Sequence, residues 1–401
     1  MNIKDLQAKF PAILKYPKMS YLDSAASSLK VQDAIDAVKH YYEDEGSNVG
    51  RGTYTMEMNA SAAYEATRKE VQSFIHAAHE DEIIFTKGTT QSLNMIAYSY
   101  AHILTKEDEI ITTELEHHAS FLPWVRVSNE TGATLIYAPL KEDLRIDVDG
   151  LINKIHSKTK IIAITMVSNV MGYVTPLQAI IKKAHEVGAI VICDAAQAAP
   201  HIPIDVQRLD CDFLAFSGHK CFGPTGVGVL YGKRHLLQTL KPMEVGGGMV
   251  AEVTHTSFTT HELPLALEAG TPPIAQVIGL RPALAFIKSL DQAWVHTYTM
   301  QLYDDAVKQL QSIKDVIVHN PTSDTPIVTF SVKGVHAHDI QSFLSEEDIA
   351  VRAGHHCAKL VGYKLGVNAT VRASIHLYNE KKDIDALVRV VKKARDFFLE
   401  N

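Results

Sequence analysis

The chain has 401 residues, of which 46% are hydrophobic and 21% are charged; this is an ordinary globular composition, long enough for a large core and a second, smaller lobe. Its formal net charge of −7 comes without a basic block, which argues against a nucleic-acid or anionic-membrane surface. The four cysteines form no CxxC pair and no apolar run approaches a membrane span, so we expect a cytoplasmic protein with free thiols.

The first eighty residues show short elements separated by breaks. Residues 1–16 have helical spacing that ends before a proline, because the residue preceding proline is disfavoured in a helix. A short strand at 21–23 runs into small residues that permit close approach of a ligand. We expect a helix over 32–42, and then a glycine-containing loop over 46–55 whose Arg51 could reach a pocket mouth.

From residue 83 onward, strand and helix patterns alternate regularly. This alternation predicts an α/β fold with a mainly parallel, seven-stranded sheet and helices on both faces. The run 189–194 is almost entirely apolar until Asp194, so we interpret it as a central strand whose aspartate lies at the carboxyl edge, where open α/β sheets bind ligands. The predicted strands are 83–85, 109–112, 134–138, 161–167, 189–194, 213–216 and 227–231.

The C-terminal third predicts a compact α+β lobe. A long helix over 274–289 follows a Pro-Pro break, and we place the domain boundary within it. An amphipathic helix closes the chain. We therefore predict a large domain of residues 21–279 and a small domain formed by 1–20 and 280–401. The strands expected in the small domain are 326–332, 349–352 and 369–375.

Lys220 is the first residue whose position indicates chemistry. It ends the segment Ser217-Gly218-His219-Lys220 after a predicted strand, where its amine could hold an aldehyde cofactor as a Schiff base. The alternative is an exposed lysine in a polar turn. Asp194 ends the preceding strand and weighs against that alternative, because pyridoxal phosphate requires a lysine and a carboxylate on its ring nitrogen. A buried carboxylate with only a packing role would be costly.

Other polar residues could complete such a cofactor site. Gln197 can hydrogen-bond a ring hydroxyl, and His117 can stack on the ring and shuttle protons. Thr89 and Thr90 lie where a strand passes into a helix, and a helix N-terminus stabilises phosphate. The alternatives are a structural histidine and a simple threonine N-cap.

A second candidate centre surrounds Cys357. This residue follows Arg352-Ala353-Gly354-His355-His356 in a predicted loop, where nearby cations favour a thiolate nucleophile. Adjacent side chains do not readily share one tetrahedral ion, so a metal site is disfavoured. The remaining cysteines lie among apolar residues and are interpreted as buried structural residues: Cys193, Cys211 and Cys221.

Arg372 lies in a predicted strand of small and apolar residues. A buried guanidinium needs a carboxylate partner. That partner is either a structural acidic residue or the carboxylate of an amino-acid substrate.

Taken together, these motifs resemble the class V aminotransferase superfamily over nearly the whole chain. Within it, Arg352-Ala353-Gly354-His355-His356-Cys357-Ala358 resembles the group II, SufS-type cysteine desulfurases. The other matching motifs are Tyr21 to Ala26, Lys87 to Thr90, Glu116 to Ala119, Val167 to Asn169, Asp194 to Gln197, Ser217 to Lys220 and Glu268 to Pro272. The sequence departs from the family pattern at Gly50, Tyr54, Cys221, Phe222 and Leu267.

The resemblance implies a fold-type-I homodimer that binds pyridoxal 5'-phosphate. It implies a cofactor site around the ring and the phosphate, made of Lys220, Asp194, Gln197, His117, Thr89, Thr90, Ser217 and His219, with Thr271 from the partner subunit. It implies substrate contacts at Asn169, Arg352 and Arg372.

The resemblance also implies the conversion of L-cysteine to L-alanine. Lys220 would move the Cα proton, Cys357 would take the sulfur as a persulfide, and His117 would supply a proton. The sulfur would pass to an acceptor protein of iron–sulfur cluster assembly. The alternatives are a selenocysteine lyase, a thiol-independent aminotransferase-like enzyme, and a catalytically silent partner protein, the last motivated by Gly50 and Tyr54.

Overall fold

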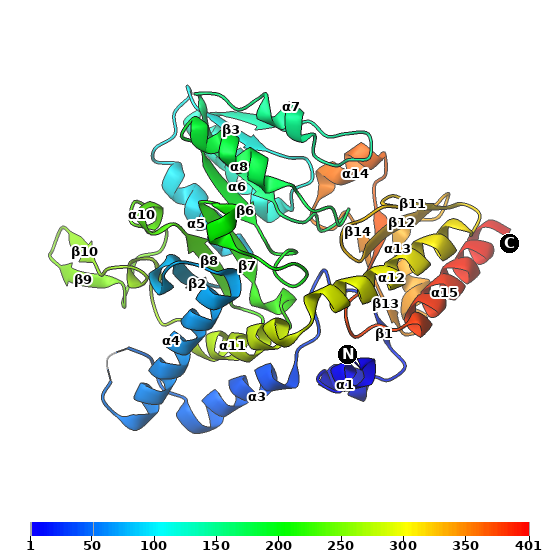
Figure 1. Ribbon diagram of the computed structural model, residues 1–401, viewed down its shortest axis with the longest axis horizontal. Coiled ribbons are helices and arrows are strands. Elements are labelled where there is room, and N and C mark those ends of the chain that lie inside the picture. Colours follow the sequence, from blue (N-terminus) through cyan, green and yellow to red (C-terminus); the bar gives the residue numbers. More distant parts are fainter. Residues whose placement is uncertain (1, 51, 401) are drawn as a thin grey trace.

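The computed structural model describes residues 2–50 and 52–400. Arg51, expected in a loop at a pocket mouth, lies outside the described residues. A seven-stranded sheet with its helices forms one part of the molecule, and a four-stranded sheet with its own helices lies beside it (Figure 1). This matches the expected large α/β part and smaller α+β part, and the exact division between residues 279 and 280 stays a prediction.

The large sheet has the order β2-β8-β7-β6-β5-β3-β4. Strand β8 runs antiparallel to both of its neighbours, and the other strands pair in parallel. The prediction of a mainly parallel, seven-stranded sheet is therefore confirmed. The strands are β2 (Ile83–Thr86), β3 (Glu109–Thr112), β4 (Thr134–Tyr137), β5 (Thr159–Thr165), β6 (Ile190–Asp194), β7 (Phe213–Ser217) and β8 (Gly228–Gly232).

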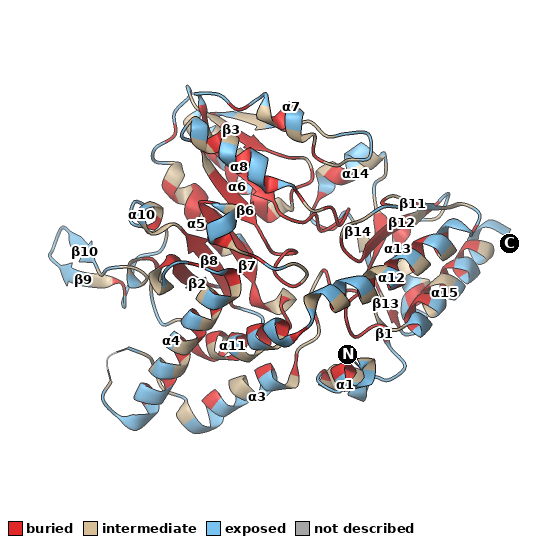
Figure 2. Ribbon diagram, in the orientation of Figure 1, coloured by how far each residue is buried: buried red, intermediate tan, exposed pale blue. Residues whose placement is uncertain are grey.

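Helices cover both faces of this sheet, and successive strand residues alternate between them. Leu214 and Phe216 of β7 belong to the core cluster packed by α4 (Thr55–Ile75), α8 (Leu177–Glu186) and α11 (Ile274–Ser289). Phe213 and Ala215 belong to the opposite cluster, packed by α5 (Thr89–Tyr100) and α6 (His118–Thr131). The sheet is thus buried on both sides, as Figure 2 shows, which accounts for its near-continuous apolar strand sequences.

The small domain is built on an antiparallel sheet of order β11-β12-β15-β14. Its core cluster extends from Leu302 to Ala394 and also includes Leu22. A short parallel pair, β1 (Ser20–Tyr21) with β13 (Ile349–Ala350), connects the N-terminal segment to this domain. The other elements are β11 (Val316–Val318), β12 (Ile327–Val332), β14 (Arg352–Gly354), β15 (Thr370–Ser374), α12 (Gln292–Gln311), α13 (Ala337–Glu346) and α15 (Lys381–Glu400).

Two expected elements are wrong in detail. The predicted strand 349–352 is divided at Val351 into β13 and β14, which belong to different sheets. The predicted N-terminal helix is two helices, α1 (Ile3–Gln7) and α2 (Pro11–Lys15), because Pro11 has no N–H to continue the first helix and is suited to begin a second.

The remaining elements are short or peripheral. A hairpin that the sequence did not predict, β9 (Val250–Val253) with β10 (Phe258–Thr260), projects at the left edge of Figure 1. Within residues 2–50 and 52–400, no helix is both long and apolar enough to cross a membrane. The other helices are α3 (Gln32–His40), which continues as a π-helical turn (Tyr41–Glu45), α7 (Val148–Ile152), α9 (Val206–Leu209), α10 (Arg234–Leu237), α14 (Lys359–Leu365) and the 3-10 turns Glu80–Glu82, Gly218–Lys220 and Leu265–Leu267.

A buried ion pair joins α4, β2 and the loop that carries Thr271. The Arg68 guanidinium is 1% exposed and donates to both carboxylate oxygens of Glu268, at 2.9 and 3.1 Å. It also donates to the Ile83 carbonyl at 2.7 Å, and Glu268 accepts from the Phe85 N–H at 2.7 Å. Removing one partner would leave a buried, uncompensated charge.

We expect Arg68→Leu to lower the free energy of unfolding by about 3–5 kcal/mol. The matched control is Arg126→Leu, which removes a half-exposed partner of Glu130 at 3.7 Å and should change stability by less than about 1 kcal/mol. Denaturant titration measures both effects. Equal losses in the two variants would contradict the energetic role of the buried pair.

Candidate active site

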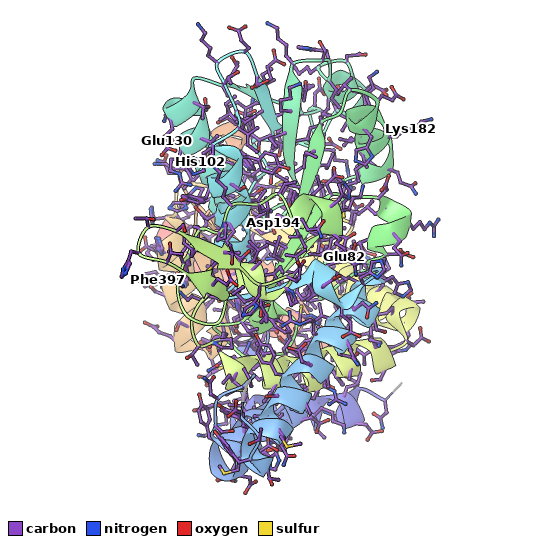
Figure 3. All side chains as sticks on the ribbon, turned by 90° about the vertical axis from the view of Figure 1, so that its left-hand side faces the viewer. Glu82, His102, Glu130, Lys182, Asp194 and Phe397 are labelled. Carbon is purple, nitrogen blue, oxygen red and sulfur yellow. The ribbon has the colours of Figure 1, made fainter. Side chains whose placement is uncertain are left out.

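A cavity of about 260 Å³ lies at the carboxyl ends of β5, β6 and β7, between the two domains. Asp194, which lines it, lies near the middle of the molecule in Figure 3. The cavity brings together residues that the sequence analysis assigned to cofactor, substrate and nucleophile: Thr89, Thr90, His117, Asn169, Asp194, Gln197, Ser217, His219, Lys220, Arg352, Cys357 and Arg372. Thr271 is the exception, because it lines separate pockets beside Glu268.

Lys220 and Asp194 meet here because β6 and β7 pair in parallel, with Asp194 opposite Ala215. Asp194 is 4% exposed and accepts from the Ala196 N–H at 2.9 Å; burial raises its carboxyl pKa. Burial lowers the pKa of Lys220 from 10.5 to about 8; Asp194 opposes this shift, and the Arg372 charge adds to it. Lys220 is therefore partly in its nucleophilic, neutral form near neutral pH.

A cradle suited to phosphate forms where α5 begins. The Thr89 N–H and hydroxyl lie 2.9 and 2.7 Å from the Ser217 hydroxyl. Gly88 occupies the N-cap position without a side-chain cap, so the structure does not support the alternative of a simple threonine N-cap. A side chain on Gly228 would overlap the Gly88 backbone, so glycine at 228 allows β8 to approach this loop closely. The N-terminus of α5 offers free N–H groups and its dipole to an anion.

His117 and His219, two of the three histidines that line the cavity, are neutral near pH 7. Burial lowers the pKa of His117 to about 4, and the Lys220 charge contributes. His117 Nδ1 accepts from the Ala119 N–H at 3.1 Å, so the neutral ring carries its proton on Nε2. Burial likewise lowers the pKa of His219 to about 4, and His219 Nδ1 lies 3.3 Å from the Ser27 hydroxyl.

Gln197 is fixed by the N-terminal segment. Its Nε2 donates to the Ala25 carbonyl at 2.8 Å. The small residues that follow the first strand therefore do contact the cavity wall, as their sequence indicated.

Asn169, His356 and Arg372 form a polar group on the small-domain side. Asn169 Nδ2 donates to the His356 carbonyl at 2.8 Å, and Arg372 Nη1 donates to the Asn169 carbonyl at 2.9 Å. Burial lowers the pKa of Arg372 to about 10. Within the described part of the chain, Asn169 Oδ1, His356 Nδ1 and Arg372 Nε are buried without a hydrogen-bond partner. Because such atoms are costly to leave unpaired, this wall is suited to a polar ligand.

Asp23 is a site residue to which the sequence analysis gave no role. Arg352 Nη2 donates to it at 2.7 Å and Arg352 Nε at 3.2 Å, and Arg372 Nη2 lies 3.6 Å from its Oδ1. Arg352 is thus bound to a carboxylate, whereas Arg372 keeps donor capacity for a ligand. The signal in the sequence was an acidic residue directly after a short strand.

Glu116 is a second residue without an assigned role. It is buried and accepts from the Thr113 hydroxyl at 2.8 Å, the Ser120 hydroxyl at 2.7 Å and the Thr165 N–H at 2.9 Å. Burial raises its carboxyl pKa to about 7. Glu116 therefore ties the start of α6, whose N-cap residue is His117, to the end of β5.

Cys357 is exposed, whereas Cys193, Cys211 and Cys221 are buried; this confirms the interpretation of the other three as buried residues. His356 and Cys357 both have left-handed backbone conformations, with φ of 52° and 53°. Non-glycine residues adopt such angles at a cost and are held there by their surroundings. No group of three or more His, Cys, Asp or Glu side chains in the described ranges is arranged to hold a metal ion.

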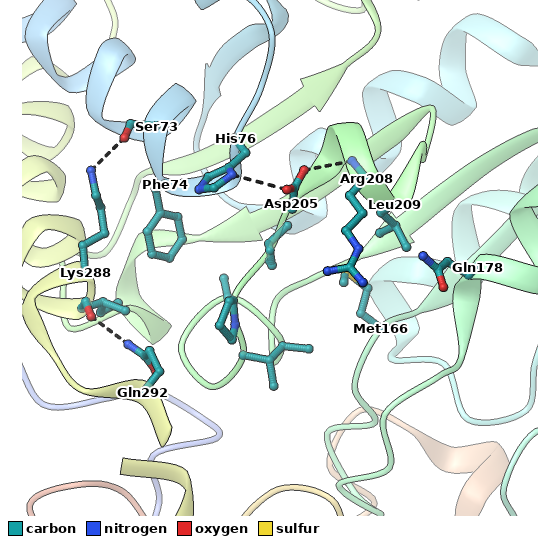
Figure 4. Close-up of a pocket in the computed structure, with 15 residues that line it drawn as sticks. Ser73, Phe74, His76, Met166, Gln178, Asp205, Arg208, Leu209, Lys288 and Gln292 are labelled. Carbon is teal, nitrogen blue, oxygen red and sulfur yellow. Dashed lines mark hydrogen bonds and ion pairs between the residues drawn. The ribbon is translucent and has the colours of Figure 1, made fainter. Parts of the chain in front are cut away.

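A larger cavity of about 530 Å³ lies beyond β5, where Met166 lines it. Its walls are mostly apolar, and several of its charged groups are paired, with Lys288 Nζ 2.8 Å from the Ser73 hydroxyl and His76 3.4 Å from Asp205 (Figure 4). Titratable groups do not converge inside it as they do around Lys220. The smaller cavity is therefore the candidate active site.

Comparisons with known proteins show the family to which the chain is similar. A family model described as aminotransferase class-V matches residues 20–387. A protein of Halalkalibacterium halodurans named probable cysteine desulfurase is 44% identical, covering 99% of both chains. A protein of the same name from Staphylococcus epidermidis is 41% identical, covering 99% of this chain and 98% of its own.

Solved structures give the same result. The crystal structure of the Escherichia coli cysteine desulfurase CsdA is 40% identical in sequence and superposes with a TM-score of 0.93, covering 100% of both chains. A cysteine desulfurase from Thermococcus onnurineus is 35% identical, with a TM-score of 0.94 and 99% coverage of both chains.

The lowered pKa of Lys220 has a measurable consequence. The rate at which Lys220 of the apoprotein forms a Schiff base with pyridoxal 5'-phosphate should rise with pH up to about 8 and then level off, because only the neutral amine reacts. Arg372→Leu should move the plateau to higher pH and Asp194→Asn to lower pH. A plateau near 10.5, or shifts in the same direction, would contradict this electrostatic account.

Proposed function

The chain belongs to the aminotransferase class-V family, and from that premise we propose that it is a pyridoxal 5'-phosphate-dependent cysteine desulfurase of the group II, SufS type. One observation carries the proposal: a single cavity is lined by an exposed thiol, Cys357, and by the amine–carboxylate pair of Lys220 and Asp194. The full-length relatives that bear this name support the reaction class.

The residues of the cavity fit the cofactor that the family uses. The Lys220 amine with lowered pKa, the buried Asp194 carboxylate and the anion cradle at Thr89 match its aldehyde, ring nitrogen and phosphate. When bound, the cofactor supplies an electron sink for the charge left at the substrate Cα. The residues that would hold it are Lys220, Asp194, Gln197, His117, Thr89, Thr90, Ser217 and His219, with Thr271 of the partner subunit.

Arg372 and Lys220 would prepare the substrate. We assign the L-cysteine carboxylate to Arg372, whose Nε is buried without a partner in the described ranges, with Asn169 Oδ1 available to a substrate donor. Arg352 remains assigned to the substrate side at the cavity mouth. The neutral Lys220 amine takes the Cα proton, which its pKa of about 8 allows near neutral pH.

Cys357 would take the sulfur. Its thiolate attacks the substrate Sγ, an S–S bond forms, and the substrate C–S bond breaks with its electron pair remaining on Cβ. Protonation of that carbon leads to L-alanine and leaves the persulfide on Cys357. His117 is neutral at pH 7, so it becomes the proton source only when an anionic ligand beside it raises its pKa.

The proposal also covers the oligomeric state, the cellular compartment and the protein that accepts the sulfur. We assign a homodimer in the cytoplasm, with no nucleic-acid or membrane partner, that passes sulfur to an acceptor protein of iron–sulfur cluster assembly. The exposed position of Cys357 supports transfer to another protein, because an acceptor thiol can reach it from solvent. L-Selenocysteine is the competing substrate, since selenium leaves carbon more readily.

Cys357→Ala is the direct test of the nucleophile. The variant should lose the formation of alanine and persulfide from L-cysteine by on the order of 100-fold, while the change in cofactor absorbance on adding cysteine remains. Alanine release and the intact mass of the protein measure the two products. Cys211→Ala, at a buried cysteine outside the cavity, is the matched control.

Full turnover of cysteine by Cys357→Ala would reject the assignment. The same variant tested with L-selenocysteine separates the two substrates. A selenocysteine lyase would keep most of its selenium activity without the thiol, whereas a desulfurase loses its sulfur activity.

The assignment of Thr271 to the partner subunit is tested by mixing subunits. Lys220→Ala and Thr271→Asp should each be inactive as homodimers, the second because its carboxylate would repel the cofactor phosphate. Co-expressed, they should form heterodimers in which one site has both Lys220 and Thr271. Recovery of roughly a quarter of wild-type activity is expected from random pairing. No recovery would place Thr271 in its own subunit's site, and an active Thr271→Asp homodimer would place it outside any site.

A further inference from the structure

His118, the first residue of α6, makes two contacts with residues 355–359, the segment around Cys357 that we call the cysteine loop. Its backbone N–H donates to the Cys357 carbonyl at 2.7 Å. Its ring Nε2 accepts from the Lys359 backbone N–H at 3.2 Å. A third large-domain contact is Asn169 Nδ2, which donates to the His356 carbonyl at 2.8 Å. Backbone groups on both sides of the thiol are therefore held by the large domain.

These contacts enclose the strained part of the loop. His356 and Cys357 have positive φ angles, and a left-handed residue with a side chain costs roughly 1–2 kcal/mol. Such strain persists only where the surroundings hold it. Loss of a contact at either end should let the loop relax and move the thiol.

The His118 ring also compensates for a missing helix cap. Lys359 begins α14, and its N–H is one of the donors that a helix start leaves unsatisfied. Ala358, at the N-cap position, has no side-chain acceptor. For Nε2 to accept, the ring proton must be on Nδ1 and the ring must be neutral. Burial, with His355 and Lys359 beside it, lowers the pKa of His118 and favours that form.

We propose that His118 is a positioning residue for Cys357: by accepting the Lys359 N–H, its imidazole keeps the loop in the conformation that places the thiol in the cavity with Lys220. His118 acts through the loop and is not assigned a contact with reacting atoms. The inference rests on the proposed function for its consequence in catalysis, whereas the contact itself is independent of that function.

Two amide variants distinguish this role from a general effect of mutation. A glutamine at 118 can present an acceptor at the reach of Nε2, whereas an asparagine is too short. In holoenzyme, His118→Asn should slow persulfide formation on Cys357 in a single turnover by about 10-fold, since small displacements of reacting groups have effects of this size or larger. In His118→Gln this rate should remain within about threefold of the wild-type rate. In both variants, the cysteine concentration that half-saturates the cofactor absorbance change should equal that of the wild-type protein.

Hydrogen exchange of the peptide containing Lys359 gives a readout without turnover. Exchange should be faster in His118→Asn than in wild type and nearly unchanged in His118→Gln, at a temperature below the melting point of each variant. Equal behaviour of the two variants, in exchange or in persulfide formation, would overturn the proposal. If the wild-type protein forms no persulfide, the proposed function fails. The hydrogen-exchange result then tests by itself whether His118 holds the Lys359 N–H.

Discussion

The position of the Cys357 thiol relative to Lys220 depends on how the loop 168–174 is bound to the small domain. Three successive carbonyls of this loop accept from small-domain side chains: Val170 from Thr329 at 2.5 Å, Met171 from Asn320 at 3.1 Å and Gly172 from Thr325 at 2.9 Å. A side chain at residue 172 would overlap this contact. Since Asn169 precedes these residues and holds both His356 and Arg372, the contact between domains determines where thiol and guanidinium lie relative to the sheet.

Burial is the second organising constraint, because it sets the protonation states in the cavity. It lowers the pKa of Lys220 to about 8, of His117 to about 4 and of Arg372 to about 10. Asp194 and Asp23 each oppose part of this effect, one beside the lysine and one beside the arginine. The same desolvation therefore gives an amine that is partly neutral and an imidazole that is neutral near pH 7. It leaves the Arg372 guanidinium charged, as the proposed contact with an amino-acid carboxylate requires.

Whether the sequence predicted a contact of the site depends on how far apart in the chain the contacting residues lie. Lys220 and Asp194 end successive parallel strands, so local pattern and strand order were sufficient to bring them together. Asp23 meets Arg352 only because β1 pairs with β13 beside β14, and that long-range pairing leaves no periodic signal. The division at Val351 was missed for the same reason: one extended run serves two sheets. Cys357 was found by its motif, whereas the backbone conformation that presents it has no signature in side-chain type.

The cysteine loop is held in the cavity by contacts that are weak enough for the loop to leave it. Each neutral hydrogen bond contributes about 0.5–1.5 kcal/mol net, so the three that hold residues 356, 357 and 359 together contribute only a few kcal/mol. The two left-handed residues oppose them with a cost of similar size. A loop near such a balance is held in the cavity while its contacts are intact, yet small changes at its ends are sufficient to free it. Under the proposed function, a thiol that takes sulfur inside the cavity and delivers it to another protein would need both states, and a rigid, unstrained loop would provide only the first.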